Sequence, residues 1–192
     1  MMSKLLYGAV GIGLSLLASL SQADTDVEIK ANIVNTSCEV SLDNNGLVEL
    51  GTKGYDYFAS GITAEDLYDG GSTFYVHVKD CMPVSGKDPS KIILHFSPLS
   101  GSFAPGSMQI FANDESNGAK NVGVVIFSIN DANNIYNVMN TDGTPRSQYD
   151  VTAADYADSR YSFYARMQKV QPGQSIVSGP VKSSVLVSVY YE

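Results

Sequence analysis

Residues 179–192 have the sequence GPVKSSVLVSVYYE, and this final stretch decides the fold. Side chains in a β-strand point alternately to its two faces, so bulky residues at every second position share one face. Here these residues are Val185, Val187, Val189 and Tyr191. No proline interrupts them, which allows a continuous strand. The pattern predicts a strand that reaches the end of the chain and needs a partner strand beside it.

A second strand of this kind is predicted near the start of the chain. Apolar residues occupy every second position, namely Val27, Ile29, Ala31 and Ile33. Polar residues, Glu28, Lys30 and Asn32, lie between them. This alternation predicts a strand with one apolar face. The two ends of the chain therefore supply two similar strands.

The first 23 residues have the composition of a cleaved export signal. Residues 1–4 are a short basic start, residues 5–20 are apolar or small, and residues 21–23 end in the small-residue pattern that signal peptidase accepts. The alternative is a membrane anchor, but the apolar stretch contains three glycines and is shorter than the roughly 20 residues that span a bilayer. We therefore expect the mature chain to begin at Asp24.

The mature chain is expected to be one acidic domain. Removal of 23 residues from 192 leaves 169, enough for one domain with its own core. The net charge of −8 becomes −9 because Lys4 is lost with the signal. An acidic chain without a cluster of Lys or Arg lacks the charge that nucleic acids and anionic membranes attract. We therefore expect no nucleic-acid partner.

The chain has two cysteines, Cys38 and Cys81, which an oxidising compartment is expected to join as a disulfide. They are 43 positions apart, and closing a loop of that size stabilises the fold by about 4 kcal/mol in the chain-entropy model. A metal site or a reactive thiol is the alternative. His77 and His95 could supply further ligands, but no closely spaced ligand pair favours a zinc site.

The body of the chain is predicted to form short antiparallel strands. Apolar and polar residues alternate in three segments, which predicts half-buried strands at residues 74–79, 92–96 and 163–168. Residues 122–129 are apolar almost throughout, as in a central strand buried on both faces or at a sheet turn. Turn residues such as Asn44, Asn45 and Gly46 separate these segments. Short strands joined by such turns predict an all-β sandwich or barrel.

Helical content is expected to be minor. A short capped turn is predicted at residues 63–67, where Asp66 follows the possible N-cap Thr63 by three positions, and another is predicted at residues 153–156. Neither segment is long enough to be a major element of the fold.

No catalytic site is predicted. His77 and His95 both lie on the polar side of alternating segments, and no nucleophile elbow or oxyanion motif accompanies either. The acidic loops lack the spacing of a calcium site, and no phosphate-binding glycine loop is present. An exported hydrolase is the enzyme hypothesis, without a specific motif to support it. We expect no metal and no cofactor.

Several features occur together in this chain. An alternating segment, Val27 to Asn35, precedes the first cysteine, and the second cysteine closes a strand near the middle of the chain. Asn121-Val122-Gly123-Val124 leads into an apolar strand. Gly179 is fourteenth from the end, and Tyr191 is the penultimate residue. In this combination the chain resembles the pilin subunits of type 1 and P fimbriae, which the bacterial chaperone-usher pathway assembles.

The resemblance implies an incomplete immunoglobulin-like β-sandwich, the pilin fold, which lacks its final strand and is completed by donor-strand exchange. Residues 24–35 would be an N-terminal donor-strand extension and residues 36–192 the pilin domain. The donor residues would be Val27, Ile29, Ala31 and Ile33. The groove, first filled by a chaperone strand and then by the next subunit, would be bordered by Gly179, Val185, Val187, Val189 and Tyr191. The implied partners are a periplasmic chaperone, an outer-membrane usher and neighbouring pilin subunits.

The implied function is that of a non-enzymatic structural subunit, exported through the periplasm to the cell surface, in a fimbria that supports adhesion. The alternative is a single-domain adhesin or glycan-binding minor subunit with a host receptor that the sequence does not identify. The cluster of Tyr55, Tyr57 and Phe58 leaves this alternative open, because exposed tyrosines can stack on sugars. A two-domain tip adhesin of the same pathway would need a longer chain.

Overall fold

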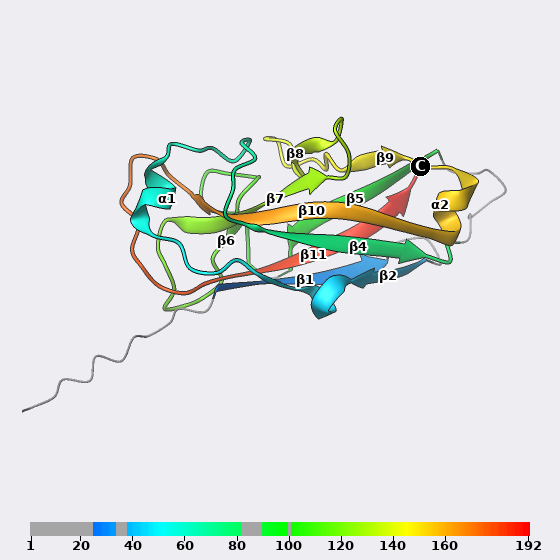
Figure 1. The fold of residues 1–192 in the computed structure, drawn as a ribbon. Helices are drawn as coiled ribbons and strands as arrows, with labels where there is room; N and C mark the ends of the chain where they lie inside the picture. The colour runs from blue at the N-terminus through cyan, green and yellow to red at the C-terminus, as the bar shows by residue number, and fades with distance from the viewer. Residues whose placement is uncertain (1–24, 34–37, 82–89, 100) are drawn as a thin grey trace, which may run out of the picture.

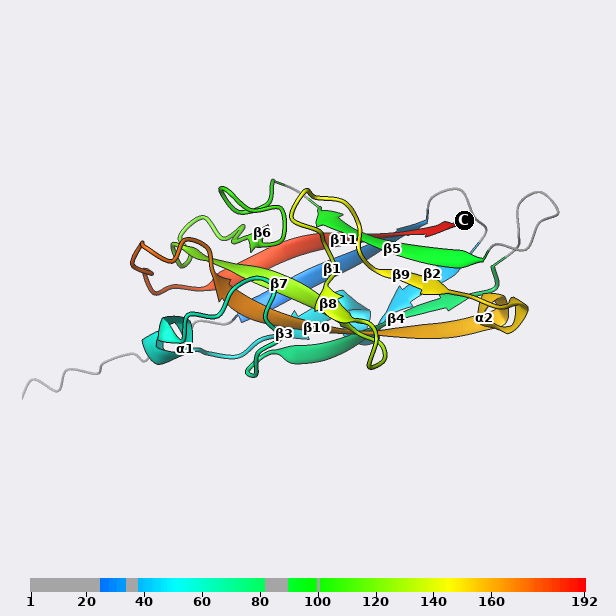
Figure 2. The same cartoon turned by 90° about the horizontal axis from the view of Figure 1, so that it is seen from above.

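The computed structural model describes residues 25–33, 38–81, 90–99 and 101–192, and it confirms the expected all-β sandwich. Two sheets pack face to face along the length of the molecule (Figures 1 and 2). The strands are β1 (Thr25–Ile33), β2 (Glu39–Leu42), β3 (Leu47–Glu49), β4 (Ser72–Lys79), β5 (Lys91–Pro98), β6 (Phe111–Ala112), β7 (Val122–Ile129), β8 (Ile135–Asn137), β9 (Gln148–Asp150), β10 (Asp158–Lys169) and β11 (Val181–Tyr191). The helical elements are η1 (Asp43–Gly46), α1 (Tyr55–Ala59) and α2 (Ala153–Ala157).

The first and last strands lie side by side in the same sheet. One sheet has the order β3-β1-β11-β5-β9, and the other has the order β2-β4-β10-β7-β6, with β8 also paired to β7. The β1 and β11 ribbons run together in both views (Figures 1 and 2). Their pairing is parallel, whereas all other strand pairs among the described residues are antiparallel. The N-terminal segment therefore fills a place beside the C-terminal strand of its own chain.

The core lies between the sheets and is built from every second residue of the long strands. Val76 of β4, Leu94 of β5 and Val187 of β11 are completely buried. The rings of Phe96 and Phe163, from opposite sheets, lie 4.8 Å apart in an edge-to-face contact. The period-two pattern of these segments thus predicted the correct inward face.

Both faces of β7 are buried, as the continuous apolar run predicted. Val124 and Ile126 face the main core, while Val125 and Phe127 belong to a second cluster outside the sandwich. Ala104 and Ile110 cover this second cluster. The outer face of the second sheet therefore carries a small core of its own.

The prediction of a half-buried strand was wrong for part of β10. Arg166 and Gln168 lie on its polar face, yet they are only 0% and 3% exposed. The physical reason is that the segment around residues 62–66 folds over them. Arg166 donates a hydrogen bond to Thr63 O (2.7 Å), and Gln168 donates one to Ile62 O (2.9 Å). Carbonyl groups a hundred residues away in sequence thus replace water on this face.

The short helical predictions are largely confirmed. α2 has a capping box, in which the side chains of Thr152 and Asp155 each accept a hydrogen bond from the other's backbone N–H. Thr63 and Asp66 form the expected capped turn, with Thr63 N donating to the Asp66 carboxylate (2.8 Å). α1 was not predicted, because its N-cap, Gly54, has no side chain to signal a helix start. In the parts of the chain that the structure describes, no helix is both long and apolar enough to span a bilayer.

Candidate functional site

The most distinctive site is a groove in the first sheet, bordered by β11 on one side and β3 on the other. β1 occupies this groove beside β11 from Val181 to Val189. Its nine residues pair with β11 from Thr25 opposite Val181 to Ile33 opposite Val189. On the other edge, β3 pairs with β1 antiparallel, with Val27 opposite Val48. Without β1, the long edge of β11 would lack this partner.

The predicted donor residues face the core where their side chains are described. Val27 is 0% exposed and Ile29 is 1% exposed, and both belong to the main core. Ala31 is half-buried, opposite Val187. Ile33 lies in β1 opposite Val189, and its side chain lies outside the described part of the structure. The alternation in sequence thus marks the face by which β1 docks.

Charged side chains lie on the outer face of β1. The Glu28 carboxylate is 3.1 Å from Lys30 Nζ and 3.5 Å from Lys182 Nζ. The hydrogen bond and positive charge of Lys30, with a smaller contribution from Lys182, lower the pKa of Glu28. Exposed pairs of this kind contribute little to stability. Burial of Val27 and Ile29 is therefore the main force that holds β1 in place.

The predicted groove residues of β11 lie where the sequence placed them. Val185, Val187 and Val189 are completely buried between the sheets. Tyr191 is half-buried, and its hydroxyl lies 3.1 Å from Cys81 Sγ. Its ring meets that of Tyr156 edge to face at 5.6 Å. Burial raises the pKa of Tyr191, so its neutral form is favoured here.

Gly179 does not line the core face with these valines. It lies two residues before β11, against the loop at Gly118 and Ala119. A Cβ atom at position 179 would lie 2.6 Å from Ala119 N, so the close approach of the two backbones requires glycine. Gly179 also lines a small apolar cavity of about 130 Å³ together with Val181. Because Val181 pairs with the first residue of β1, this cavity lies at the end of the groove where β1 begins.

The other edge of the first half of β11 is held by side chains that the sequence did not single out. Lys182 N donates to Asn113 Oδ1 (2.9 Å), and Ser184 N donates to Asp114 Oδ2 (2.8 Å). Asn113 Nδ2 also donates to Pro180 O (3.0 Å). β5 pairs with β11 only from Val185 onward. These side-chain contacts take the place of a paired strand along the preceding residues of β11. Strand periodicity carries no signal for such side-chain pairing.

The disulfide is confirmed between Cys38 and Cys81, whose Cα atoms are 4.1 Å apart. Cys38 directly precedes β2, and Cys81 follows the end of β4. The disulfide therefore fixes the chain five residues after Ile33, where β1 ends. Any movement of β1 would have this point as its fixed end.

Each of the two histidines contacts a neighbouring side chain of the fold. His77 Nε2 lies 2.9 Å from Asp43 Oδ1, at the start of η1. His95 lies beside the ring of Tyr190 at 6.4 Å, and burial lowers the pKa of its imidazole. Neither contact places a nucleophile beside the ring. Among the described residues, no group of three His, Cys, Asp or Glu side chains is positioned to hold a metal ion.

The tyrosine cluster is only partly exposed. Tyr57 and Phe58 pack against the main core, and their rings meet edge to face at 5.1 Å. Tyr57 also donates a hydrogen bond to Met167 O (3.2 Å), which fixes α1 to β10. Tyr55 is 62% exposed at the rim of the small cavity beside Gly179. Two of the three aromatic residues thus stabilise the fold.

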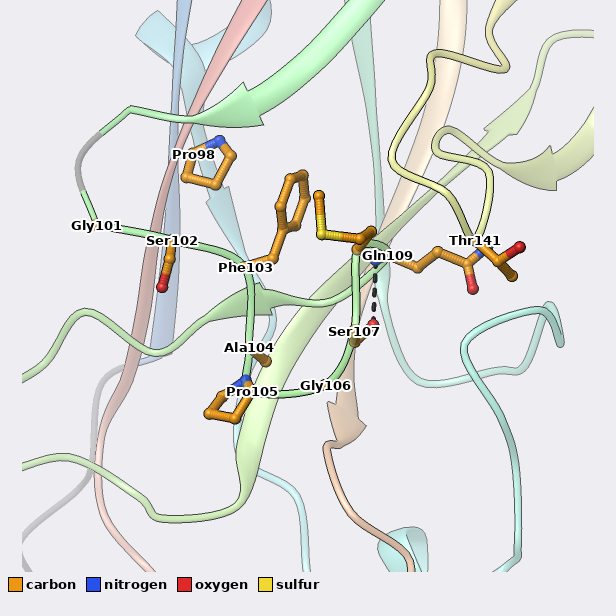
Figure 3. Close-up of a pocket in the computed structure, with 11 residues that line it drawn as sticks. Pro98, Gly101, Ser102, Phe103, Ala104, Pro105, Gly106, Ser107, Gln109 and Thr141 are labelled. Atoms are coloured by element: carbon orange, nitrogen blue, oxygen red, sulfur yellow. Dashed lines mark hydrogen bonds between the residues drawn. The ribbon is translucent and has the colours of Figure 1, made fainter.

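A larger cavity of about 740 Å³ lies on the outside of the sandwich (Figure 3). The loop of residues 101–109 supplies most of its lining, and Pro98 and Thr141 complete it. Ser107 Oγ accepts a hydrogen bond from Gln109 N (3.1 Å), the dashed line in Figure 3. Its lining residues include no acid, histidine, lysine or cysteine, so they offer no group for acid–base or metal chemistry.

Comparison with known proteins gives three findings. The family model described as Fimbrial protein matches residues 27–192. The uncharacterized fimbrial-like protein YadK of Escherichia coli (strain K12) is 43% identical over 171 residues, which cover 88% of this chain and 86% of that protein. The crystal structure of the CupB6 tip adhesin from Pseudomonas aeruginosa aligns over 83% of this chain with 12% identity and a TM-score of 0.49. This chain spans only 45% of that structure's length.

Proposed function

This chain belongs to the fimbrial protein family and is a fimbrial subunit, and we propose that it polymerises by exchanging its N-terminal strand between subunits. Residues 1–23 are then the signal peptide, residues 24–35 the donor-strand extension and residues 36–192 the pilin domain. The observation that carries the proposal is the docking of β1. It pairs with β11 over nine residues and buries Val27 and Ile29, and cleavage after residue 23 would leave it joined to the rest of the chain at one end only.

The groove has the properties needed to accept a strand from another subunit. Strand addition derives its affinity from main-chain hydrogen bonds and its register from alternate side chains in pockets. β11 and β3 offer main-chain groups on both sides of the groove, and Val185, Val187 and Val189 place apolar side chains on the core side of the β11 border. A neighbour's Val27, Ile29, Ala31 and Ile33 would present the same alternating face as the resident β1.

The polarity of the inserted strand decides what kind of assembly forms. In its own groove, β1 runs parallel to β11 and ends opposite Val189, near the disulfide at Cys38. A neighbour's strand of the same polarity would bring the Cys38 ends of two subunits together, and each strand could then fill the other's groove in a closed pair. A strand of opposite polarity would place the neighbour at the Gly179 end. The assembly would then be an open fibre to which further subunits can be added. We therefore infer that the exchanged strand runs antiparallel to β11.

As a fimbrial protein, the chain contacts other pilin subunits in a fimbrium at the cell surface. Its further partners under this proposal are a periplasmic chaperone and an outer-membrane usher. An empty groove would expose the apolar residues of β11 and a long unpaired strand edge, and such a surface aggregates unless another strand covers it. A chaperone strand in the groove during periplasmic transit would prevent this. The role is non-enzymatic, needs no cofactor and supports bacterial adhesion.

Deletion of residues 27–33 tests the donor strand. The truncated subunit keeps β11 and the groove, so we expect it to bind the chaperone while failing to enter the groove of a preceding subunit. Fibres produced with tagged full-length and tagged truncated chains are compared by immunoelectron microscopy, and chaperone binding is measured by co-purification. A matched control replaces the outward residues Glu28 and Lys30 by Ser, and this variant should assemble normally. Normal incorporation of the truncated chain would contradict the proposal.

A further inference from the structure

The turn at Asn44, Asn45 and Gly46 has an unusual backbone. All three residues have positive φ angles, 49°, 53° and 79°, in the left-handed region that asparagine and glycine tolerate best. Asn44 Nδ2 donates to Leu47 O (3.1 Å), which closes the turn on itself. Asp43, at its start, contacts His77 of β4. The turn is the unlabelled coil beside β1 in Figure 1.

This turn brings Gly46 against the backbone of β1. A Cβ atom at position 46 would overlap the carbonyl oxygen of Ile29 and would lie 3.1 Å from its carbonyl carbon. Leu42 Cδ1, 3.3 Å away, closes off another direction. Gly46 is buried. Only glycine therefore fits at this position while β1 is docked.

The contact controls how the outer edge of the groove closes. The residue after Gly46 is Leu47, the first residue of β3, and β3 pairs with β1 from Asp26 to Glu28. If the turn moved outward, β3 would move away from β1 and the outer hydrogen-bonded edge would be lost. The atoms of β1 nearest to the Cβ position of Gly46 are main-chain atoms of Ile29, and the one nearby side chain, Leu42, lies outside β1. The fit therefore does not depend on the side chains of the strand in the groove.

We propose that Gly46 is a positioning residue that lets β3 close on the backbone of whichever strand fills the groove. For the resident β1, the inference follows from the contacts described above. For a neighbour's strand or a chaperone's strand, it rests on the proposed function. The Asn44–Gly46 turn would thus let the groove bind the main chain of any strand. The apolar residues of the groove would then determine which strand is preferred.

The test compares two glycines of the full mature chain. Gly46→Ala adds both a strained φ and a collision with β1. Gly51→Ala adds only the strain, because Gly51 has φ +64° and nothing within 4 Å of its Cβ position. Hydrogen exchange is measured at the β1 amides and at the β10 amides. We expect Gly46→Ala to lower protection of β1 at least about tenfold more than that of β10, and Gly51→Ala to change both strands equally.

An equal loss at β1 and β10 in Gly46→Ala, or the same β1-selective loss in Gly51→Ala, would overturn the inference. If Gly46→Ala gives no folded protein, Asn45→Ala is the second variant. Asn45 is exposed, so alanine there disfavours the left-handed turn without adding an atom beside β1. A loss of protection confined to β1 supports the inference, and no selective loss rejects it. If the unsubstituted chain forms no fibres, while Gly46→Ala still lowers protection selectively at β1, the result counts against the proposed function alone.

Discussion

Arg166 shows how a single residue can hold a loop on a sheet. It is completely buried on the outer face of β10, and burial lowers the pKa of its guanidinium. The group donates hydrogen bonds to Thr63 O (2.7 Å), Asp66 O (2.6 Å) and Met167 O (3.1 Å). It also lies 5.2 Å from the ring centre of Phe127. One side chain thus supplies hydrogen-bond donors to three main-chain carbonyl groups.

Arg166→Met should therefore destabilise the fold strongly. The methionine fills much of the volume but removes the charge-assisted hydrogen bonds to Thr63 O and Asp66 O, and the expected loss in free energy of unfolding is about 3 kcal/mol. The measurement is urea denaturation followed by circular dichroism. The matched control is Arg160→Met on the same strand, where the guanidinium is exposed and lies 3.9 Å from the ring centre of Tyr75. The control should cost less than about 1 kcal/mol. Similar losses in the two variants would show that the buried contacts of Arg166 are unimportant.

At the scale of elements, sequence periodicity predicted the strands that face the main core. Alternation located β1, β4, β5 and β11 because each has an apolar face on that core and a more polar opposite face. The continuous run of β7 predicted burial on both faces for the same reason. Most of the groove could thus be located from the sequence, since β11, which borders it, and β1, which fills it, are both alternating strands.

Other parts of the fold and site depend on contacts that alternation does not encode. The polar face of β10 is buried by a loop about a hundred positions earlier in the sequence. Short strands such as β3 and β6 have too few residues to show a period. Gly46 belongs to a recognisable turn, but its contact with Ile29 follows from where the turn lies in space. These features follow from tertiary packing.

Locking β1 in its own groove should stop assembly. Lys30 and Leu186 are directly opposite each other in the parallel pair and lie on its outward face. Neighbouring strands are about 4.8 Å apart, within reach of a disulfide. Lys30→Cys combined with Leu186→Cys should form an internal disulfide that keeps the oxidised chain from either giving or accepting a strand. Non-reducing electrophoresis with peptide mapping detects the bond, and electron microscopy detects the fibres.

The Lys30→Cys single variant serves as the control, because it has no partner thiol in the docked strand and should assemble normally. The double variant should also give no series of disulfide-linked oligomers on the non-reducing gel. In an antiparallel inserted strand, position 30 would not lie opposite position 186. Fibres formed by the internally bonded chain would show that β1 need not leave its groove.

At the scale of the whole molecule, buried tyrosines gather near the C-terminal end of the sandwich. The rings of Tyr149 and Tyr161 stack with centres 4.8 Å apart, and Tyr156 meets Tyr191. The Tyr149 hydroxyl lies 2.7 Å from Ser128 Oγ. Burial raises the pKa of Tyr149, Tyr161 and Tyr191 above the ordinary value. The folded protein therefore holds these phenolic protons more tightly than the unfolded chain does.

Stability should consequently fall in alkali. Above pH about 10 the unfolded chain releases phenolic protons that the folded chain retains, so the unfolded state gains the advantage as pH rises. Below that pH, the tyrosine contribution to stability is fully present. Urea denaturation at pH values from 8 to about 11 should show a free energy of unfolding that declines from near pH 10. Tyr161→Phe should make the decline shallower, because it removes one of the buried phenols. A slope unaffected by Tyr161→Phe would contradict this account.

The docked β1 also determines which sheet edges the waiting subunit presents. With β1 in place, the first sheet ends on β3 and β9, which are three residues long each. Edges this short are poor templates for the stacking that begins amyloid deposits. Under the proposed strand exchange, the eleven-residue β11 would lose its cover only while one strand leaves and another arrives. Irregular aggregation would then be a risk mainly during the exchange itself, and a faster exchange would lose less protein to it.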